Sequence, residues 1–296
     1  MTERNNQNRF DAPNPDEVPN TPSHAQNIQV PQQQPAPVNM QFSVPTEFVD
    51  LPSKGRYYPQ GHPLCGKESV EIRYMTAKEE DILASATLIR RGVVFDRLIQ
   101  SVMVDRIDPN DLLVGDKNAL LIAARITGYG PEYQTEVRCP SCSQKSNFMF
   151  DLSQADISMQ EKESNKKVFE VEQTNNGTFV FNLVSMNCAV EVKLLNGHDE
   201  KKLSFVSNAK NKNNLVESLI TDTLKAYIVS VNGDSSRATV NQFVDTLPAS
   251  ASRTIRNMYK LIIPKVSVES QYSCANCGHE EHLEVPLNAD FFWPNE

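Results

Sequence analysis

The chain has 296 residues, and its hydrophobic content of 39% is enough for one large or two modest folded domains. Its formal net charge is -8 at pH 7. This charge argues against a non-specific nucleic-acid binder, because such proteins need a basic surface to displace counterions from phosphates. No run approaches the length of an apolar membrane span, and the N-terminus lacks the cationic and apolar parts of a secretory signal. We therefore expect no membrane partner and synthesis in a cytosol.

Residues 1–45 form a first segment that is rich in Asn, Gln and Pro and has almost no periodic apolar pattern. Such a composition cannot bury enough apolar surface to offset the entropy that ordering removes. We expect a disordered tail, unless a neighbouring protein holds it extended.

Residues 46–152 predict a helical unit that ends in a pair of cysteines. An aromatic-flanked turn at 51–59, with the sequence LPSKGRYYP, precedes a short strand at 69–74. Thr76, with a glutamate three residues later, forms a capping box that predicts a helix running to about residue 90.

Two further helices are predicted before the first cysteine pair. Apolar residues recur at helical spacing between Phe95 and Val102, which indicates the second helix. Asp116 is expected to cap a third, nearly all-apolar helix that ends at Gly128.

Two Cys-x-x-Cys pairs, far apart in the chain, are its most specific signal. Structural zinc takes four tetrahedral ligands with sulfur at about 2.3 Å, and a two-residue spacer lets one turn present both sulfurs to one ion. Val137 and Tyr272 precede the two pairs at the same offset, and alternating apolar residues follow both pairs. Each arm therefore has the pattern of a strand, a cysteine turn (knuckle) and a second strand. We predict one structural zinc ion per chain, bound by Cys139, Cys142, Cys274 and Cys277.

Separate redox-active pairs and unmetallated core cysteines are the alternatives for these four residues. A redox pair generally opens a helix, whose dipole lowers a thiol pKa, whereas strand-like sequence surrounds both pairs here. His279 and His282 follow the second pair and are expected to be exposed, because four thiolates already fill a structural site. Cys65 and Cys188 are expected to be small buried hydrophobic residues.

Residues 153–268 predict a mixed α/β insert between the two knuckles. Its strands are expected at 167–171, 179–184 and 190–195, and its helices at 215–231, 239–247 and 249–261. Asn175-Asn176-Gly177 predicts a tight hairpin turn between the first two strands.

Residues 269–296 complete the chain with the second knuckle and an aromatic C-terminal tail. The expected fold class is thus α+β, with a helical N-terminal unit joined to a four-cysteine zinc ribbon and the insert between its knuckles.

Catalytic motifs are not found in this sequence. There is no P-loop, no His-Glu-x-x-His and no Gly-x-Ser-x-Gly, and a closed four-thiolate site has no open position for a reacting water. Near the knuckles only Arg138 and Lys145 are basic, among several glutamates, which disfavours phosphate binding. We expect neither an enzyme nor direct nucleic-acid binding.

The aromatic run Phe291-Phe292-Trp293 near the C-terminus leaves two interpretations open. Three adjacent aromatic residues at a chain end bury poorly in a lone domain, which favours docking on a partner. They can instead fold back onto the ribbon.

Several passages together resemble one family, the baseplate hub proteins of contractile-tailed, T4-like bacteriophages. The resemblance rests on LPSKGRYYPQGHPLCGKESVEIRYMTAKEEDIL, on DRLIQSVMVD and DLLVGDKNALLIAARITGYG, on both knuckles and on VPLNADFFWP. It covers about residues 47–296. It implies a non-enzymatic tail component whose partners are other baseplate hub proteins and the tape-measure protein. It also implies assembly in the host bacterial cytoplasm and a location in the tail baseplate of the virion.

Three functions follow from these observations. The leading hypothesis is a zinc-stabilised structural subunit of the baseplate hub that acts by protein–protein contact. The alternative is a transient assembly factor that is absent from the mature virion, and the third is a zinc-ribbon nucleic-acid module. The turn at 51–59, the aromatic tail and the N-terminal segment are the expected contact surfaces, because aromatic residues flanked by proline suit burial by a partner.

Overall fold

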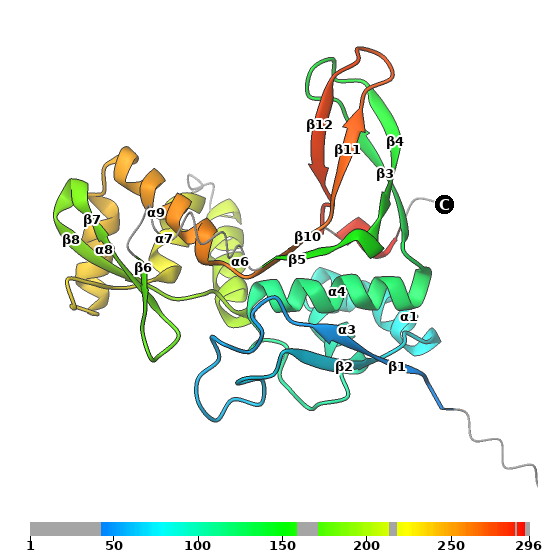
Figure 1. Ribbon diagram of the computed structural model, residues 1–296, viewed down its shortest axis with the longest axis horizontal. Coiled ribbons are helices and arrows are strands. Elements are labelled where there is room, and N and C mark those ends of the chain that lie inside the picture. The colour runs from blue at the N-terminus through cyan, green and yellow to red at the C-terminus, as the bar shows by residue number, and fades with distance from the viewer. Residues whose placement is uncertain (1–42, 159–170, 213–217, 288, 294–296) are drawn as a thin grey trace, which may run out of the picture. The chain divides into compact units, whose positions relative to one another are not determined.

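The computed structural model describes residues 43–158, 171–212, 218–287 and 289–293 (Figure 1). The predicted tail lies outside the described residues as far as residue 42, and so does most of the strand predicted at 167–171. The described chain has the mixed α+β composition that we predicted, with small antiparallel sheets. Within it, no helix combines the length and the apolar character needed to cross a membrane.

The first part of the chain pairs two strands and packs four helices beside them. These elements are β1 (Thr46–Asp50), β2 (Ser69–Arg73), α1 (Ala77–Ala84), α2 (Ala86–Arg90), α3 (Val94–Val102) and α4 (Val114–Tyr129). The predicted capping box is confirmed, because the carboxylate of Glu79 accepts hydrogen bonds from the backbone and side chain of Thr76. The single helix predicted to residue 90 is wrong: Ser85 adopts extended backbone and divides it into α1 and α2.

Asp116 does not cap α4 and instead lies fully buried in its first turn. Its carboxylate accepts hydrogen bonds from the backbone N–H of Ser53 at 2.9 Å, from the Ser53 hydroxyl at 2.6 Å and from the Tyr58 hydroxyl at 2.7 Å. The Tyr58 oxygen in turn accepts the N–H of Leu113 at 3.0 Å. Burial raises the pKa of Asp116, although the bonds from Ser53 and Tyr58 oppose the shift.

These bonds hold the turn at 51–59 against the start of α4. Leu51 and Tyr58 are buried, and the half-buried Tyr57 packs on Phe179 with ring centroids 5.3 Å apart. The expectation that the apolar side chains of this turn face a partner is therefore wrong, because the chain buries them itself.

The middle part of the chain is a four-stranded antiparallel sheet with order β6-β7-β8-β9, accompanied by helices. Its elements are β6 (Val171–Gln173), β7 (Phe179–Leu183), η2 (Val184–Met186), β8 (Cys188–Val192), α6 (Gly197–Lys212), α7 (Leu219–Tyr227), β9 (Ile228–Val231), α8 (Arg237–Asp245) and α9 (Ala249–Ile262). The predicted tight turn is confirmed between β6 and β7, where Gly177 has φ +75°. The helix predicted at 215–231 is wrong in its last turn, because Ile228–Val231 pairs with β8 as a strand.

The segments before and after the middle part together form two hairpins and a short ladder. Their elements are β3 (Glu132–Arg138), β4 (Lys145–Asp151), η1 (Leu152–Gln154), β5 (Asp156–Ser158), β10 (Lys265–Ser267), β11 (Glu269–Ser273), β12 (Glu280–Glu284) and η3 (Ala289–Phe292). β5 and β10 pair antiparallel, so the chain enters and leaves the middle part side by side.

Close backbone approaches join the middle part to α4. A Cβ atom on Gly115 would lie 1.9 Å from the carbonyl oxygen of Pro264, whereas one on Gly128 would meet only the side chain of Met75, at 3.0 Å. Backbone hydrogen bonds also connect Val114 to Leu195 and Gly197 to Leu112, each at 3.1 Å. Only glycine fits where two backbones approach this closely.

The C-terminal aromatic residues fold back onto the chain. Phe291 and Phe292 are buried, with ring centroids 5.1 Å from Tyr133 and 5.5 Å from Phe95 respectively. Arg125 donates a hydrogen bond from Nε to the carbonyl of Phe291 at 3.2 Å. Of the two open interpretations, the structure supports folding back, and docking of these two phenylalanines on a partner is wrong.

The two cysteines outside the knuckles do not both follow the prediction. Cys65 is exposed, so its expected burial is wrong. Cys188 is half-buried at the start of β8, and burial raises the pKa of its thiol.

Candidate metal centre

The two knuckles share one backbone conformation. The N–H of Cys139 donates to the carbonyl of Gln144, and the N–H of Ser143 donates to the carbonyl of Cys139, both at 2.9 Å. The same two bonds recur at the same offsets around Cys274, again at 2.9 Å. Each turn therefore presents its two sulfurs in the same way.

The fourth residue after the first cysteine is left-handed in both knuckles. Ser143 has φ +61° and Gly278 has φ +68°. Glycine adopts this region without steric strain, whereas a side chain costs about 1 kcal/mol there. The backbone is therefore strained at Ser143 in the first knuckle, whereas Gly278 occupies the equivalent position in the second knuckle without strain.

Two hairpins place the knuckles opposite each other. β3 pairs with β4 and β11 pairs with β12, each in continuous antiparallel register, and Figure 1 shows the two hairpins side by side. Tyr272 of β11 reaches β4, where its hydroxyl lies 3.2 Å from the Ser146 hydroxyl and its ring packs edge-on against Phe148. Tyr272 is buried together with Cys139 and Cys274, so an apolar contact beneath the sulfurs joins the hairpins.

All four predicted cysteines come together at the tips of these hairpins. Their sulfur atoms lie within 4.8 Å of one another, and this group can hold a metal ion. The Sγ atoms are 3.7 Å apart between Cys139 and Cys277, and 3.7 Å apart between Cys142 and Cys274. Four sulfurs placed tetrahedrally at about 2.3 Å from one ion would be about 3.8 Å apart. Because these close pairs cross between the knuckles, the geometry suits one shared ion better than two separate redox pairs.

Neighbouring N–H groups favour thiolates at part of the site. The backbone N–H groups of Cys277 and Asn276 lower the pKa of Cys274 to about 6, and the side chain of Asn276 lowers the pKa of Cys142. For Cys277, the N–H of His279 acts in the same direction, but burial and the neighbouring sulfurs outweigh it and raise the pKa to about 11. Four thiolates cannot share this space without a cation, and a bound metal ion would supply the compensating charge.

The nearby histidines lie outside this group of sulfurs. His279 Nε2 lies 3.7 Å from a carboxylate oxygen of Glu281, and His282 is exposed on β12 opposite Gln271. Among the described residues, the group of potential metal ligands consists of the four cysteines.

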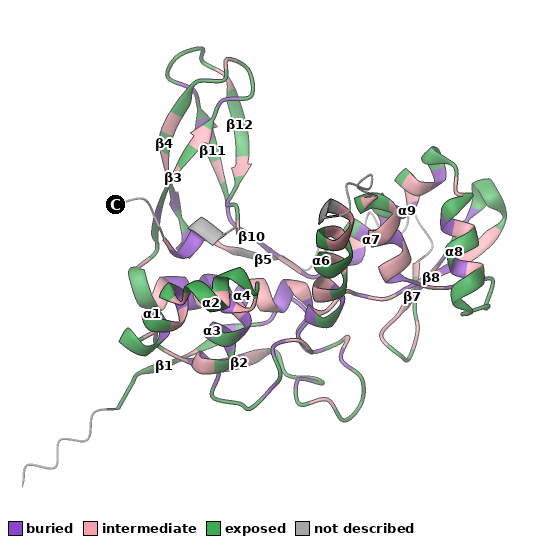
Figure 2. Cartoon of the chain, turned by 180° about the vertical axis from the view of Figure 1, so that it is seen from behind, coloured by how far each residue is buried: buried purple, intermediate pink, exposed green. Residues whose placement is uncertain are grey.

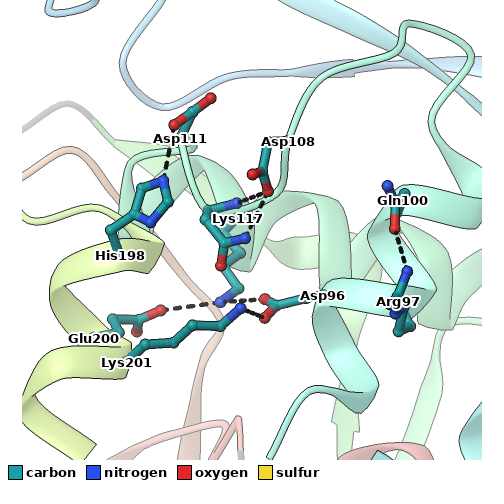
Figure 3. A network of polar contacts seen from close by, with 10 residues as sticks. Asp96, Arg97, Gln100, Asp108, Asp111, Lys117, His198, Glu200 and Lys201 are labelled. Atoms are coloured by element: carbon teal, nitrogen blue, oxygen red, sulfur yellow. Dashed lines mark hydrogen bonds and ion pairs between the residues drawn. The ribbon is translucent and has the colours of Figure 1, made fainter.

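A second polar cluster was not predicted from the sequence (Figure 3). Lys117 of α4 lies 2.9 Å from Asp96 of α3 and 3.0 Å from Glu200 of α6, and Lys201 lies 2.7 Å from Asp96. Burial would raise the pKa of Asp96, but the ammonium groups of Lys201 and Lys117 outweigh it and lower the pKa below 3.8. These residues are far apart in the chain, and no local motif predicts their meeting.

Comparison with models of known protein families shows which family the chain resembles. The model of a family described as T4 bacteriophage base plate protein matches residues 45–293. No curated protein and no solved structure matches the chain. The matched region includes both knuckles and everything between them.

Proposed function

This chain belongs to the T4 bacteriophage base plate protein family, and from that premise we propose that it is a zinc-stabilised structural subunit of the baseplate hub. The observation that carries the proposal is the extent of the match, from residue 45 to residue 293. It begins just before β1 and ends just after the buried Phe292. The matched region therefore contains the four cysteines and all of the chain between the two knuckles.

The donor set supports zinc in a ribbon as the occupant of the metal centre. Four cysteine sulfurs in a tetrahedral arrangement suit zinc or an iron–sulfur cluster, and the sulfur separations of 3.7 Å match a single ion of zinc's size. Binding would stabilise the folded chain by on the order of 10 kcal/mol. The ion would hold the hairpin that precedes the middle part to the hairpin that follows it.

The proposed activity is protein–protein contact without catalysis. Four sulfur ligands would close the metal's coordination, which leaves no position for a reacting water. The proposed partners are other tail and baseplate hub proteins, including the tape-measure protein. The proposed location is the virion tail, after assembly in the host bacterial cytoplasm.

Mass spectrometry of purified virions and of infected-cell lysates tests this function. A structural subunit is expected in both samples, and cryo-electron microscopy of the tail should show density for it. Presence in lysates with absence from virions would contradict the structural role and support a transient assembly factor instead. A salt-dependent DNA or RNA titration at low ionic strength should stay flat, because a binding curve would support a nucleic-acid module.

A further inference from the structure

Two hollows meet where α2, α3 and α6 come together. The first has a volume of about 650 Å³ and the second about 730 Å³. Arg91, Val93, Asp96 and Lys201 line both of them, so they form one continuous groove. Figure 2 shows exposed residues on the outer surfaces of α2 and α6, and we call this feature the α2–α6 groove.

Three arginines in the first hollow have no acidic partner among the residues that the structure describes. Arg91, Arg97 and Arg106 are exposed, and no carboxylate within the described part of the chain forms an ion pair with any of them. The guanidinium group of Arg97 donates a hydrogen bond to the side-chain oxygen of Gln100, at 3.0 Å (Figure 3). In a protein with a net charge of -8, three uncompensated guanidinium groups at one hollow create a local positive site.

The carboxylates beside these arginines are already engaged. Asp96 is held by Lys117 and Lys201, and Asp105 lies 2.7 Å from Lys67. Asp108 accepts hydrogen bonds from the backbone and side chain of Asn110. An incoming carboxylate is thus free to pair with the guanidinium groups.

Exposed apolar side chains line the second hollow. Phe205 on α6 is 75% exposed and Ile89 on α2 is 41% exposed, and the half-buried Phe95 also lines this hollow. Large apolar side chains beside a hollow are typical anchors of protein interfaces. The groove therefore offers an apolar end and a positively charged end.

We propose that the α2–α6 groove binds an amphipathic, carboxylate-bearing segment of another protein. Its apolar side chains pack on Phe205 and Ile89, and its carboxylates pair with Arg91, Arg97 and Arg106. The proposal rests on the proposed function as a contact-forming subunit and identifies one surface that makes the contact. Bidentate pairing of arginine with carboxylates adds geometric specificity to the apolar burial.

Two other occupants fit the groove less well. A phosphate backbone has no apolar groups to pack on Phe205 and Ile89, which line the second hollow. A second copy of the chain could offer the acidic face of the β11–β12 hairpin, which carries Glu269, Glu280 and Glu284. The residues between these glutamates on that face are Gln271 and His282, so the face has no apolar side chain for Phe205.

Fluorescence anisotropy with the full-length, metal-loaded chain tests the proposal. The probe is a labelled 16-residue helical peptide with leucines on one face and glutamates flanking them. We expect saturable binding that weakens as salt rises. Equal binding of a matched peptide with lysine in place of glutamate, or with serine in place of leucine, would overturn the proposal.

Groove variants locate the binding site of the probe. Arg91→Ala, Arg97→Ala and Arg106→Ala should each weaken binding about twofold to fivefold. Arg253→Ala is the matched control, because Arg253 is an exposed arginine on α9, outside the groove. Equal losses in the control and the groove variants would overturn the assignment.

The apolar anchor has its own matched pair. Phe205→Ser should weaken binding about tenfold, whereas Phe48→Ser on β1, where the side chain is 71% exposed, should leave it unchanged. Displacement of the peptide by a single-stranded DNA oligonucleotide would overturn the proposal in favour of nucleic acid. Self-association of the chain that Arg91→Glu abolishes would overturn it in favour of a second copy. Because purified protein is used, failure here leaves the presence of the chain in virions as a separate question.

Discussion

Replacing Tyr58 by phenylalanine removes a hydroxyl that connects two buried groups. That hydroxyl donates to the Asp116 carboxylate at 2.7 Å and accepts the N–H of Leu113 at 3.0 Å. Each buried polar group left without a partner costs about 1 to 3 kcal/mol. Because Asp116 keeps its bonds from Ser53, we expect Tyr58→Phe to lower the free energy of unfolding by about 2 to 4 kcal/mol.

Tyr227 supplies a matched control in the middle part of the chain. Its side chain is 1% exposed and stacks on Tyr259, but its hydroxyl has no hydrogen-bond partner among the described residues. Tyr227→Phe should therefore be neutral or stabilise the protein by up to about 1 kcal/mol. Urea unfolding of both variants, with the metal retained, measures the difference. Equal effects of the two substitutions would refute the role given to the Asp116 hydrogen bonds.

Three further predictions concern backbone approach, knuckle strain and pH. Gly115→Ala should lower the free energy of unfolding by about 3 kcal/mol, because the added methyl group meets a backbone carbonyl. Gly128→Ala should change the free energy of unfolding by less than about 1 kcal/mol, because the added methyl group meets a side chain. Equal urea midpoints for the two variants would contradict this. Ser143→Gly should stabilise the protein by about 1 kcal/mol and raise its melting temperature, whereas Gly278→Ala should destabilise it by about 1 kcal/mol and lower the melting temperature. Shifts of the same sign would argue against a left-handed residue at both positions. Because the pKa of Asp96 is lowered from 3.8, its ion pairs stabilise the fold above that pH and are lost as pH falls through the folded-state pKa. The stability difference between the parent chain and Asp96→Asn should therefore shrink on acidification in urea titrations, and a constant difference would contradict the cause given for the shift.

Local sequence was sufficient where the chemistry itself is local. Both knuckles are complete within a few residues, and their matching flanks predicted the strands on which Val137 and Tyr272 lie. The Asn-Asn-Gly turn and the capping box at Thr76 were predictable for the same reason. The meeting of the two knuckles followed from the ligand number of zinc, since each supplies only two sulfurs.

Contacts between distant residues could not be predicted in this way. Asp116 has the position of a helix cap in sequence, but Ser53 and Tyr58 approach it from more than fifty positions away and bury it. The apolar spacing near Ile228 suits a helix as well as a strand, and only pairing with β8 selects the strand. The sequence of the turn at 51–59 predicted an exposed surface, but the hydrogen bonds of Ser53 and Tyr58 to Asp116 hold this turn against α4.

Metal analysis of the purified full-length chain tests the central claim most directly. Inductively coupled plasma mass spectrometry, referred to the protein concentration, should give one zinc per chain. Cys142→Ser and Cys274→Ser should each lose that zinc and destabilise the protein to a similar degree, because they take one ligand from each knuckle of a shared site. Two zinc ions per chain, or none, would contradict a single site formed by both knuckles.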